Sequence, residues 1–76
     1  MNYKFSKHAL EQMEMRDIPL DLVETILLNP NQLLPANDGT IYQSLTQDRK
    51  HLIRIFVNDI NQVITVYRTS QNQEIL

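Results

Sequence analysis

The chain has 76 residues, with seven Lys and Arg against nine Asp and Glu, so its net charge at pH 7 is −2. A chain of this length holds one hydrophobic core, which excludes two-domain architectures, large barrels and doubly wound sheets. We therefore treat residues 1–76 as a single domain. The absence of cysteine excludes disulfides and thiolate zinc sites, and the acidic balance argues against nucleic-acid binding through overall charge alone.

Apolar runs in the sequence are short. Pairs such as Leu27-Leu28 and Leu33-Leu34 are interrupted by Asn, Gln and Pro, far below the roughly 20 apolar residues of a membrane span. The N-terminal residues also lack the apolar stretch of a secretory signal. The sequence therefore predicts a cytoplasmic protein that does not enter a membrane.

The first periodic segment is an amphipathic helix. Ser6 is a suitable N-cap, and Lys7–Met15 contains neither glycine nor proline. At about 100° per residue, Ala9, Leu10 and Met13 form one apolar seam, with charged residues on the other side. This seam predicts that the helix lies against a core.

A second helix follows the break at Asp17-Ile18-Pro19. Apolar residues again recur at helical spacing until Asn29-Pro30 ends the pattern. The predicted buried seam of this helix consists of Leu20, Val23, Ile26 and Leu27.

After Pro30 the apolar period changes to two, which is typical of strands. Three segments, Thr40–Thr46, His51–Val57 and Gln62–Thr69, are rich in β-branched and aromatic residues and are separated by turn sequences. Gln32–Ala36 adds a short strand, and Pro35 restricts it to an edge. The pattern predicts an α+β fold with two N-terminal helices packed on one face of a three- to four-stranded antiparallel sheet, and a loose or partner-facing tail over residues 70–76.

Face assignment depends on the turn at Asn58–Asn61. If this turn contains an even number of residues, the aliphatic face carries Ile53, Ile55, Val57, Ile64 and Val66, and the helices cover it. The opposite face then carries Leu52, Arg54, Phe56, Val63, Thr65 and Tyr67, with Arg54 opposite Thr65 in the tightest register. Such a mixed face is too apolar to be left in water, so it predicts a site or a protein contact.

Charge is unevenly distributed along the chain. The segment 49–68 contains Arg49, Lys50, Arg54 and Arg68 against Asp59 alone. A local basic patch binds phosphate even in an acidic protein, because salt screens charges beyond a Debye length of about 8 Å. The alternative is that these arginines pair with the acidic helices.

Three segments carry a resemblance to a known family. The run from Phe5 to Ile18 (FSKHALEQMEMRDI), the helix ending Leu-Leu-Asn-Pro30 and the terminal Val-Ile-Thr-Val-Tyr-Arg68 resemble a family of small bacterial domains of unknown function. That family is related to RelE- and BrnT-type toxins of the barnase, EndoU, colicin and RelE-like ribonuclease fold. The resemblance spans Tyr3 to Thr69. It implies a RelE-like toxin-type domain, a ribonuclease toxin of a type II toxin–antitoxin pair, with two helices on a curved antiparallel sheet.

The resemblance also implies metal-independent RNA cleavage in which a 2′-hydroxyl attacks the neighbouring phosphate, with no cofactor and no metal site. His8 then transfers the proton, since imidazole titrates near neutrality, and Arg16 grips a phosphate. Further donors come from the last two strands. The residues expected in catalysis are His8, Arg16, Thr65 and Tyr67, and those expected to bind phosphate are Arg54 and Arg68. The family often has a basic residue where this chain has Gln12.

Each of these residues also has a structural interpretation. His8 is then a hydrogen-bonded histidine at a helix boundary, Arg16 caps its own helix, and Tyr67 packs on the sheet. His51 is assigned to the surface. The corresponding second hypothesis is a non-enzymatic interaction domain of the same fold. The expected partners are therefore RNA and an antitoxin protein under the first hypothesis, and a second copy of the chain or another protein under the second.

Overall fold

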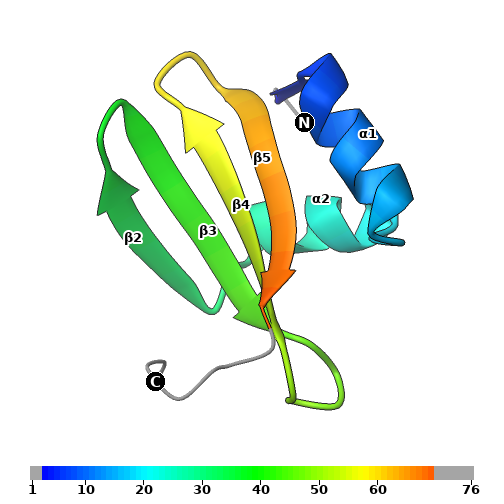
Figure 1. Cartoon of the computed structure of the whole chain (residues 1–76). Coiled ribbons are helices and arrows are strands. Elements are labelled where there is room, and N and C mark those ends of the chain that lie inside the picture. Colours follow the sequence, from blue (N-terminus) through cyan, green and yellow to red (C-terminus); the bar gives the residue numbers. More distant parts are fainter. Residues whose placement is uncertain (1–2, 70–76) are drawn as a thin grey trace.

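The computed structural model describes residues 3–69, so the predicted loose tail lies outside the described residues. Two helices and five strands follow each other in the chain (Figure 1). In order, they are β1 (Lys4–Phe5), α1 (Lys7–Met15), α2 (Leu20–Leu28), β2 (Gln32–Ala36), β3 (Gly39–Leu45), β4 (Leu52–Asn58) and β5 (Gln62–Thr69).

The strands form one mixed sheet in the order β1-β5-β4-β3-β2. The predicted α+β class and the four-stranded antiparallel part, including the edge strand β2, are confirmed. A purely antiparallel sheet is wrong, because β1 adds a fifth strand that runs parallel to β5 and pairs Lys4 with Gln62 and Phe5 with Val63. Two residues are too few to show a period in the sequence, so this strand was not predicted.

Helix α1 runs along the edge of β5 (Figure 1). Ser6 caps it as predicted, accepting a hydrogen bond from the Ala9 N–H at 3.0 Å. Ala9 and Met13 are buried, but Leu10 is 48% exposed. The prediction for Leu10 is wrong because a helix that contacts a sheet edge buries only a narrow i, i+4 stripe.

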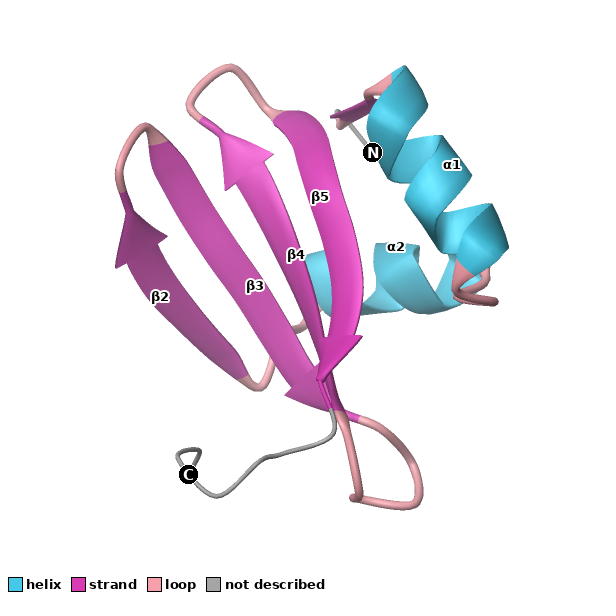
Figure 2. Cartoon of the chain, viewed as in Figure 1, coloured by secondary structure: helices cyan, strands magenta, loops and turns pink. Residues whose placement is uncertain are grey.

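Helix α2 lies behind the sheet, and its end is near the start of β2 (Figure 2). Val23, Ile26 and Leu27 are buried as predicted, whereas Leu20 is half exposed at the first helical position. Asn29 ends the helix directly before Pro30, as expected from the restriction that proline places on the preceding residue. Within residues 3–69, neither helix has the length and apolar character needed to cross a bilayer.

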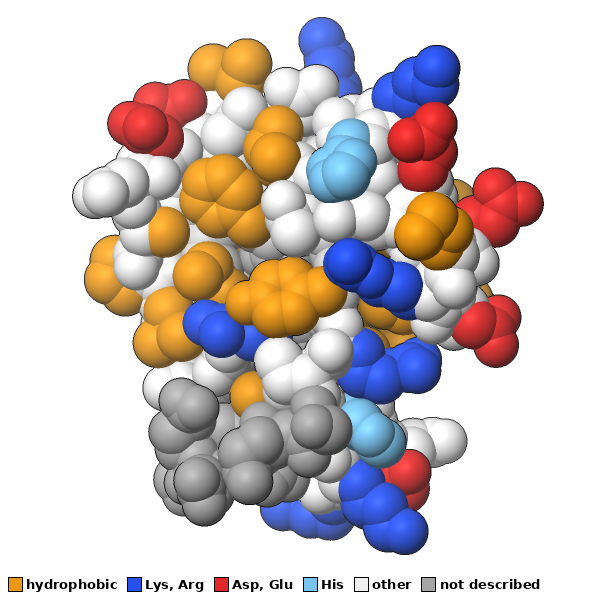
Figure 3. Space-filling view, viewed as in Figure 1, with side chains coloured by type: hydrophobic (Ala, Val, Ile, Leu, Met, Phe, Trp, Pro, Cys, Tyr) orange, Lys and Arg blue, Asp and Glu red, His pale blue; other side chains and the backbone are white. Residues whose placement is uncertain are grey.

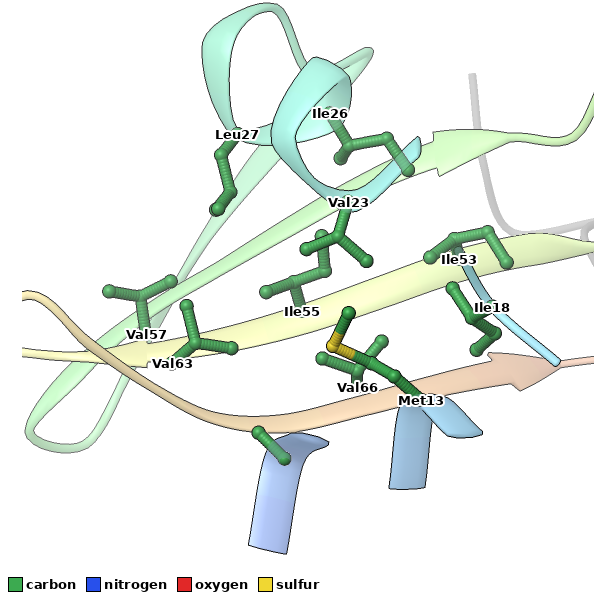
Figure 4. Close-up of a cluster of buried hydrophobic side chains, with 11 residues drawn as sticks. Met13, Ile18, Val23, Ile26, Leu27, Ile53, Ile55, Val57, Val63 and Val66 are labelled. Carbon is green, nitrogen blue, oxygen red and sulfur yellow. The ribbon is translucent and has the colours of Figure 1, made fainter. Parts of the chain in front are cut away.

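The core lies between the helices and one face of the sheet, which we call the helix face (Figure 4). Figure 4 shows Val23 of α2 above Ile55 of β4, with Met13 of α1 beside Val66 of β5. The buried apolar residues of this cluster are Ala9, Met13, Ile18, Val23, Ile26, Leu27, Ile53, Ile55, Val57, Val63 and Val66. The other face, which we call the open face, has no helix over it among the described elements (Figure 2).

A β-bulge changes the predicted face assignment of β5. Phe56 pairs with Thr65 but Val57 pairs with Val63, so Ile64 is an extra residue in β5. Val63, which pairs with Val57, is buried on the helix face, so the predicted assignment of Ile64 to that face and of Val63 to the opposite face is wrong. Beyond the bulge the prediction holds, since Val66 is on the helix face and Thr65 and Tyr67 are on the open face.

Candidate functional site

Two polar side chains, Gln12 of α1 and Arg16 at its C-terminal end, cover the edge of β5. Since β1 pairs only with the first residues of β5, the edge beyond Val63 lacks a strand partner. The side chain of Gln12 accepts a hydrogen bond from the Val66 N–H at 3.0 Å, and the Arg16 guanidinium donates to the Val66 carbonyl at 2.8 Å. Both residues thus hold α1 against β5. The family that the chain resembles often has a basic residue at the position of Gln12. In this structure, the Gln12 side chain binds the backbone N–H of Val66 instead.

On the open face, Arg54 and Tyr67 lie together. Arg54 is directly opposite Tyr67, and its guanidinium carbon is 5.7 Å from the centre of the tyrosine ring, a cation–π distance. The predicted pairing of Arg54 with Thr65 is wrong, because Val57 pairs with Val63, one residue later than in the tightest register, and the bulge adds a second residue, so Thr65 is opposite Phe56. Arg54 Nε is buried without a hydrogen-bond partner in the structure.

This pair is the end of a polar row that crosses the open face. The row continues through Gln43, opposite Arg54, to Gln32 on β2, and the Gln43 amide donates to the Gln32 side-chain oxygen at 2.8 Å. Apolar side chains flank the row on both sides. They are Leu34, Ile41 and Phe56 on one side and Leu45 and Leu52 on the other.

Arg68 lies in a shallow pocket at the far end of β5, which we call the hairpin pocket. The pocket has a volume of about 450 Å³ and is lined by Thr46, Gln47, Asp48, His51 and Arg68. Arg68 pairs with Ile53, so His51, two residues before Ile53, is a diagonal neighbour of Arg68 on the same face. The sequence predicts only a surface position for His51, with no functional role. The period-two pattern was the signal that could have connected it with Arg68.

Hydrogen bonds hold the turn that forms this pocket. The Thr46 hydroxyl donates to Asp48 Oδ1 at 2.6 Å, and the Lys50 N–H donates to the same oxygen at 3.0 Å. These two bonds, together with the nearby charges of His51 and Lys50, lower the pKa of Asp48 below its usual value. The Asp48 carboxylate is thus ionised and fixed by its own turn.

His8 lies apart from the other predicted residues. It is exposed in the first turn of α1 and forms no hydrogen bond or ion pair with residues 3–69. Arg16 follows eight residues later, which is about 12 Å along a helix axis. The structure therefore brings Arg54 to Tyr67 and Arg16 to the backbone beside Tyr67, while His8 is at the other end of α1.

The cations at the border of β5 form a continuous surface. In Figure 3, Lys, Arg and His side chains form a column beside β5, from α1 down to the β3–β4 turn, and several acidic side chains lie on the outer side of α1. We define Arg16, Lys50, His51 and Arg68 as the β5 edge patch. Within residues 3–69, no ion pair joins Arg54 or Arg68 to an acidic side chain of the helices.

No group of three or more His, Cys, Asp or Glu side chains within residues 3–69 is arranged to hold a metal ion. Comparisons with protein-family models, with curated proteins and with solved structures found no match to this chain.

Proposed function

We propose that the protein is an endoribonuclease that binds single-stranded RNA along the β5 edge patch. The observation that carries this proposal is the position of Tyr67, which follows the Val66 carbonyl bound by Arg16 and directly precedes Arg68. The ring lies on the open face, 5.7 Å from the Arg54 guanidinium carbon, and Arg16 and Arg68 lie at the adjoining β5 edge, so the position is suited to a stacked base with its phosphates at that edge. RNA is favoured over a neutral ligand because the patch is cationic in a chain whose net charge is −2.

The proposed binding uses donors that the fold leaves available. Arg16 uses one guanidinium N–H on the Val66 carbonyl, and a guanidinium has five, so the others remain for a phosphate. Arg54 lies near the Tyr67 ring and increases the positive charge where a base stacks. Thr65 is two residues from Tyr67 on the same face, and in this proposal its hydroxyl donates to the sugar or base.

In the proposed reaction, the 2′-oxygen attacks the adjacent phosphorus, and the bond from phosphorus to the 5′-oxygen breaks. The products are a 2′,3′-cyclic phosphate and a 5′-hydroxyl. His8 accepts the 2′-hydroxyl proton while water protonates the leaving 5′-oxygen, or His8 protonates that oxygen while water accepts the 2′-hydroxyl proton, and the arginines bind neighbouring phosphates of the strand. Because His8 is exposed at the far end of α1, this mechanism requires the RNA to extend from Tyr67 along α1.

The direct test is incubation of the purified protein with a labelled single-stranded RNA and analysis of the product ends. We expect 2′,3′-cyclic phosphate ends and no cleavage of the 2′-deoxy analogue. His8→Ala is expected to lower the rate about 10² to 10⁴-fold, the usual effect of removing an acid–base group. Glu11→Ala, an exposed change on the same helix, is the control and should retain activity. Equal rates in the His8→Ala variant and the wild type would remove His8 from the mechanism.

The biological role that we propose is that of a toxin of a type II pair, acting in the cytoplasm and inhibited by an antitoxin protein that covers the open face. Inducible expression of the wild type should arrest growth and degrade RNA, whereas His8→Ala at the same protein level should do neither. Harmless expression of the wild type would contradict the toxin proposal.

A second function, non-enzymatic protein binding, is favoured by the apolar rows on the open face. Phe56, Leu34 and Ile41 form one such row across three strands. If this face binds a second copy, the wild type should sediment as a dimer that Phe56→Lys dissociates. A monomer at high concentration would argue against a homodimer.

A further inference from the structure

The hairpin pocket joins two residues of the β5 edge patch, His51 and Arg68, to three residues that the proposed function does not use, Thr46, Gln47 and Asp48. Its lining combines the Arg68 guanidinium, the His51 imidazole and the Gln47 amide, which have N–H donors, with the Thr46 hydroxyl, which already donates to Asp48. Arg68 is exposed, and within residues 3–69 no hydrogen bond or ion pair holds its guanidinium. The pocket therefore contains a cation without an internal partner, beside a second nitrogen donor.

This donor set matches a phosphate group. Guanidinium binds phosphate oxygens through paired N–H donors, and imidazole donates an N–H in both its neutral and its protonated form. The volume of about 450 Å³ is in the range of small-molecule sites, so a phosphate enters together with part of its nucleotide. We propose that the hairpin pocket is a phosphate-binding subsite in which Arg68 and His51 hold one phosphate of the RNA.

The identification of RNA as the source of this phosphate rests on the proposed function. Tyr67 and Arg68 are consecutive in β5, so their side chains point to opposite faces of the sheet. An RNA strand that crosses the β5 edge passes from the tyrosine on the open face to the arginine on the other face. The subsite thus accounts for the phosphate next to the nucleotide stacked on Tyr67.

Asp48 is the one acidic side chain in the pocket lining, and its negative charge repels a bound anion. Its Oδ1 is already bound by the Thr46 hydroxyl and the Lys50 N–H, which identifies a structural role in the turn. Asn retains that acceptor oxygen without the charge. Asp48→Asn should therefore keep the turn and bind phosphate more tightly. Its expected effect on phosphate affinity is opposite to that of removing the Arg68 charge.

The experiment titrates inorganic phosphate into the full chain, followed by NMR of the Arg68 side chain and the His51 ring, with a short 2′-deoxy oligonucleotide as a second ligand. Arg68→Gln should weaken phosphate binding about tenfold, as expected for the loss of a charge-assisted bidentate contact. His51→Gln should weaken it less, and Asp48→Asn should strengthen it about two- to threefold. Lys4→Gln, an exposed change in β1 that removes the same charge, is the control and should bind like the wild type. Backbone amide spectra of each variant establish that it is folded.

The outcomes separate this inference from the proposed function. Phosphate binding that is lost in Arg68→Gln but kept in Lys4→Gln supports the subsite, even if the protein cleaves no RNA. Equal binding by these two variants, or the absence of phosphate shifts at Arg68 and His51, overturns the subsite even if RNA is cleaved. If inorganic phosphate binds there but the oligonucleotide does not shift these resonances, the subsite stands as a phosphate site and RNA is rejected as its source.

Discussion

The two faces of the sheet differ in what covers them and in what their residues do. The helix face is aliphatic at its centre, with Ile55 and Val66 fully buried beneath the helices. The open face carries a polar row between apolar rows, and Arg54 lies there with a buried nitrogen that has no partner. Burial on the helix face thus contributes most to stability, while the open face holds the buried nitrogen that lacks a partner within the described residues, Arg54 Nε.

The largest expected effect tests the division of stability between the faces. Ile55→Ala on the helix face should lower the free energy of unfolding by about 2 to 5 kcal/mol, because it leaves a cavity in the core. Ile41→Ala on the half-buried open face should cost below about 2 kcal/mol. Urea unfolding measures both. Equal losses would show that the open face contributes as much to stability as the helix face.

The next effect concerns the packing at the start of β3. A Cβ on Gly39 would contact the Val57 carbonyl and lie 2.9 Å from both Asn58 Cα and the Phe56 ring. Because two of these neighbours are backbone atoms, Gly39→Ala should cost about 1 to 3 kcal/mol. Asn37→Ala, an exposed change in the same turn, should change stability by less than about 0.5 kcal/mol. An unchanged unfolding midpoint for Gly39→Ala would contradict this close packing.

A smaller effect is expected where α1 meets the β5 edge. Gln12→Ala leaves the Val66 N–H without its acceptor and should cost about 1 kcal/mol. Gln12→Glu keeps an acceptor oxygen at the same position and should retain most of the stability. If the two variants unfold alike in urea, the hydrogen bond from Val66 does not stabilise the edge.

The smallest expected effect is a pH dependence of the free energy of unfolding, which arises from two tyrosines on the helix-face side of the sheet. The Tyr3 and Tyr42 hydroxyls are 3.1 Å apart, and this hydrogen bond, with burial, raises the pKa of Tyr3 to about 12. The unfolded value is about 10, so the contribution of Tyr3 is complete below pH 10 and is lost as the pH rises towards 12. Urea midpoints should therefore fall over this range, and Tyr3→Phe should reduce that fall. If the urea midpoints of the wild type and Tyr3→Phe change with pH in parallel, the assignment of this pH dependence to Tyr3 is contradicted.

Much of the fold could be predicted because its signals are local. The Ser6 cap, the limits of both helices and the edge position of β2 each depend on residues within a few positions of one another. The bulge at Ile64 and the pairing of β1 could not be predicted in this way. Both depend on which strand edges meet in space, and a shift of one residue exchanges the faces of Val63 and Ile64.

The candidate site was predicted less completely than the fold. The resemblance, together with the chemistry of the side chains, indicated Arg16, Arg54, Tyr67 and Arg68 as candidates. The partners of these residues, however, depend on tertiary contacts. The bond from Arg16 to a carbonyl fifty residues later in the chain has no local signal. In the hairpin pocket, the period-two pattern puts His51 and Arg68 on one face, but their position beside the turn residues Thr46 and Gln47 depends on strand pairing.

The measurement that tests the central claim most directly is the salt dependence of single-stranded RNA binding, with a 2′-O-methyl RNA oligonucleotide that cannot be cleaved. A plot of log affinity against log salt has a slope set by the number of phosphates neutralised, about 0.7 for each contact on a single strand. We expect Arg16→Gln and Arg68→Gln each to reduce the slope by about this amount, and Lys4→Gln to leave it unchanged. Equal slopes in all three variants and the wild type would contradict an RNA-binding role for the β5 edge patch.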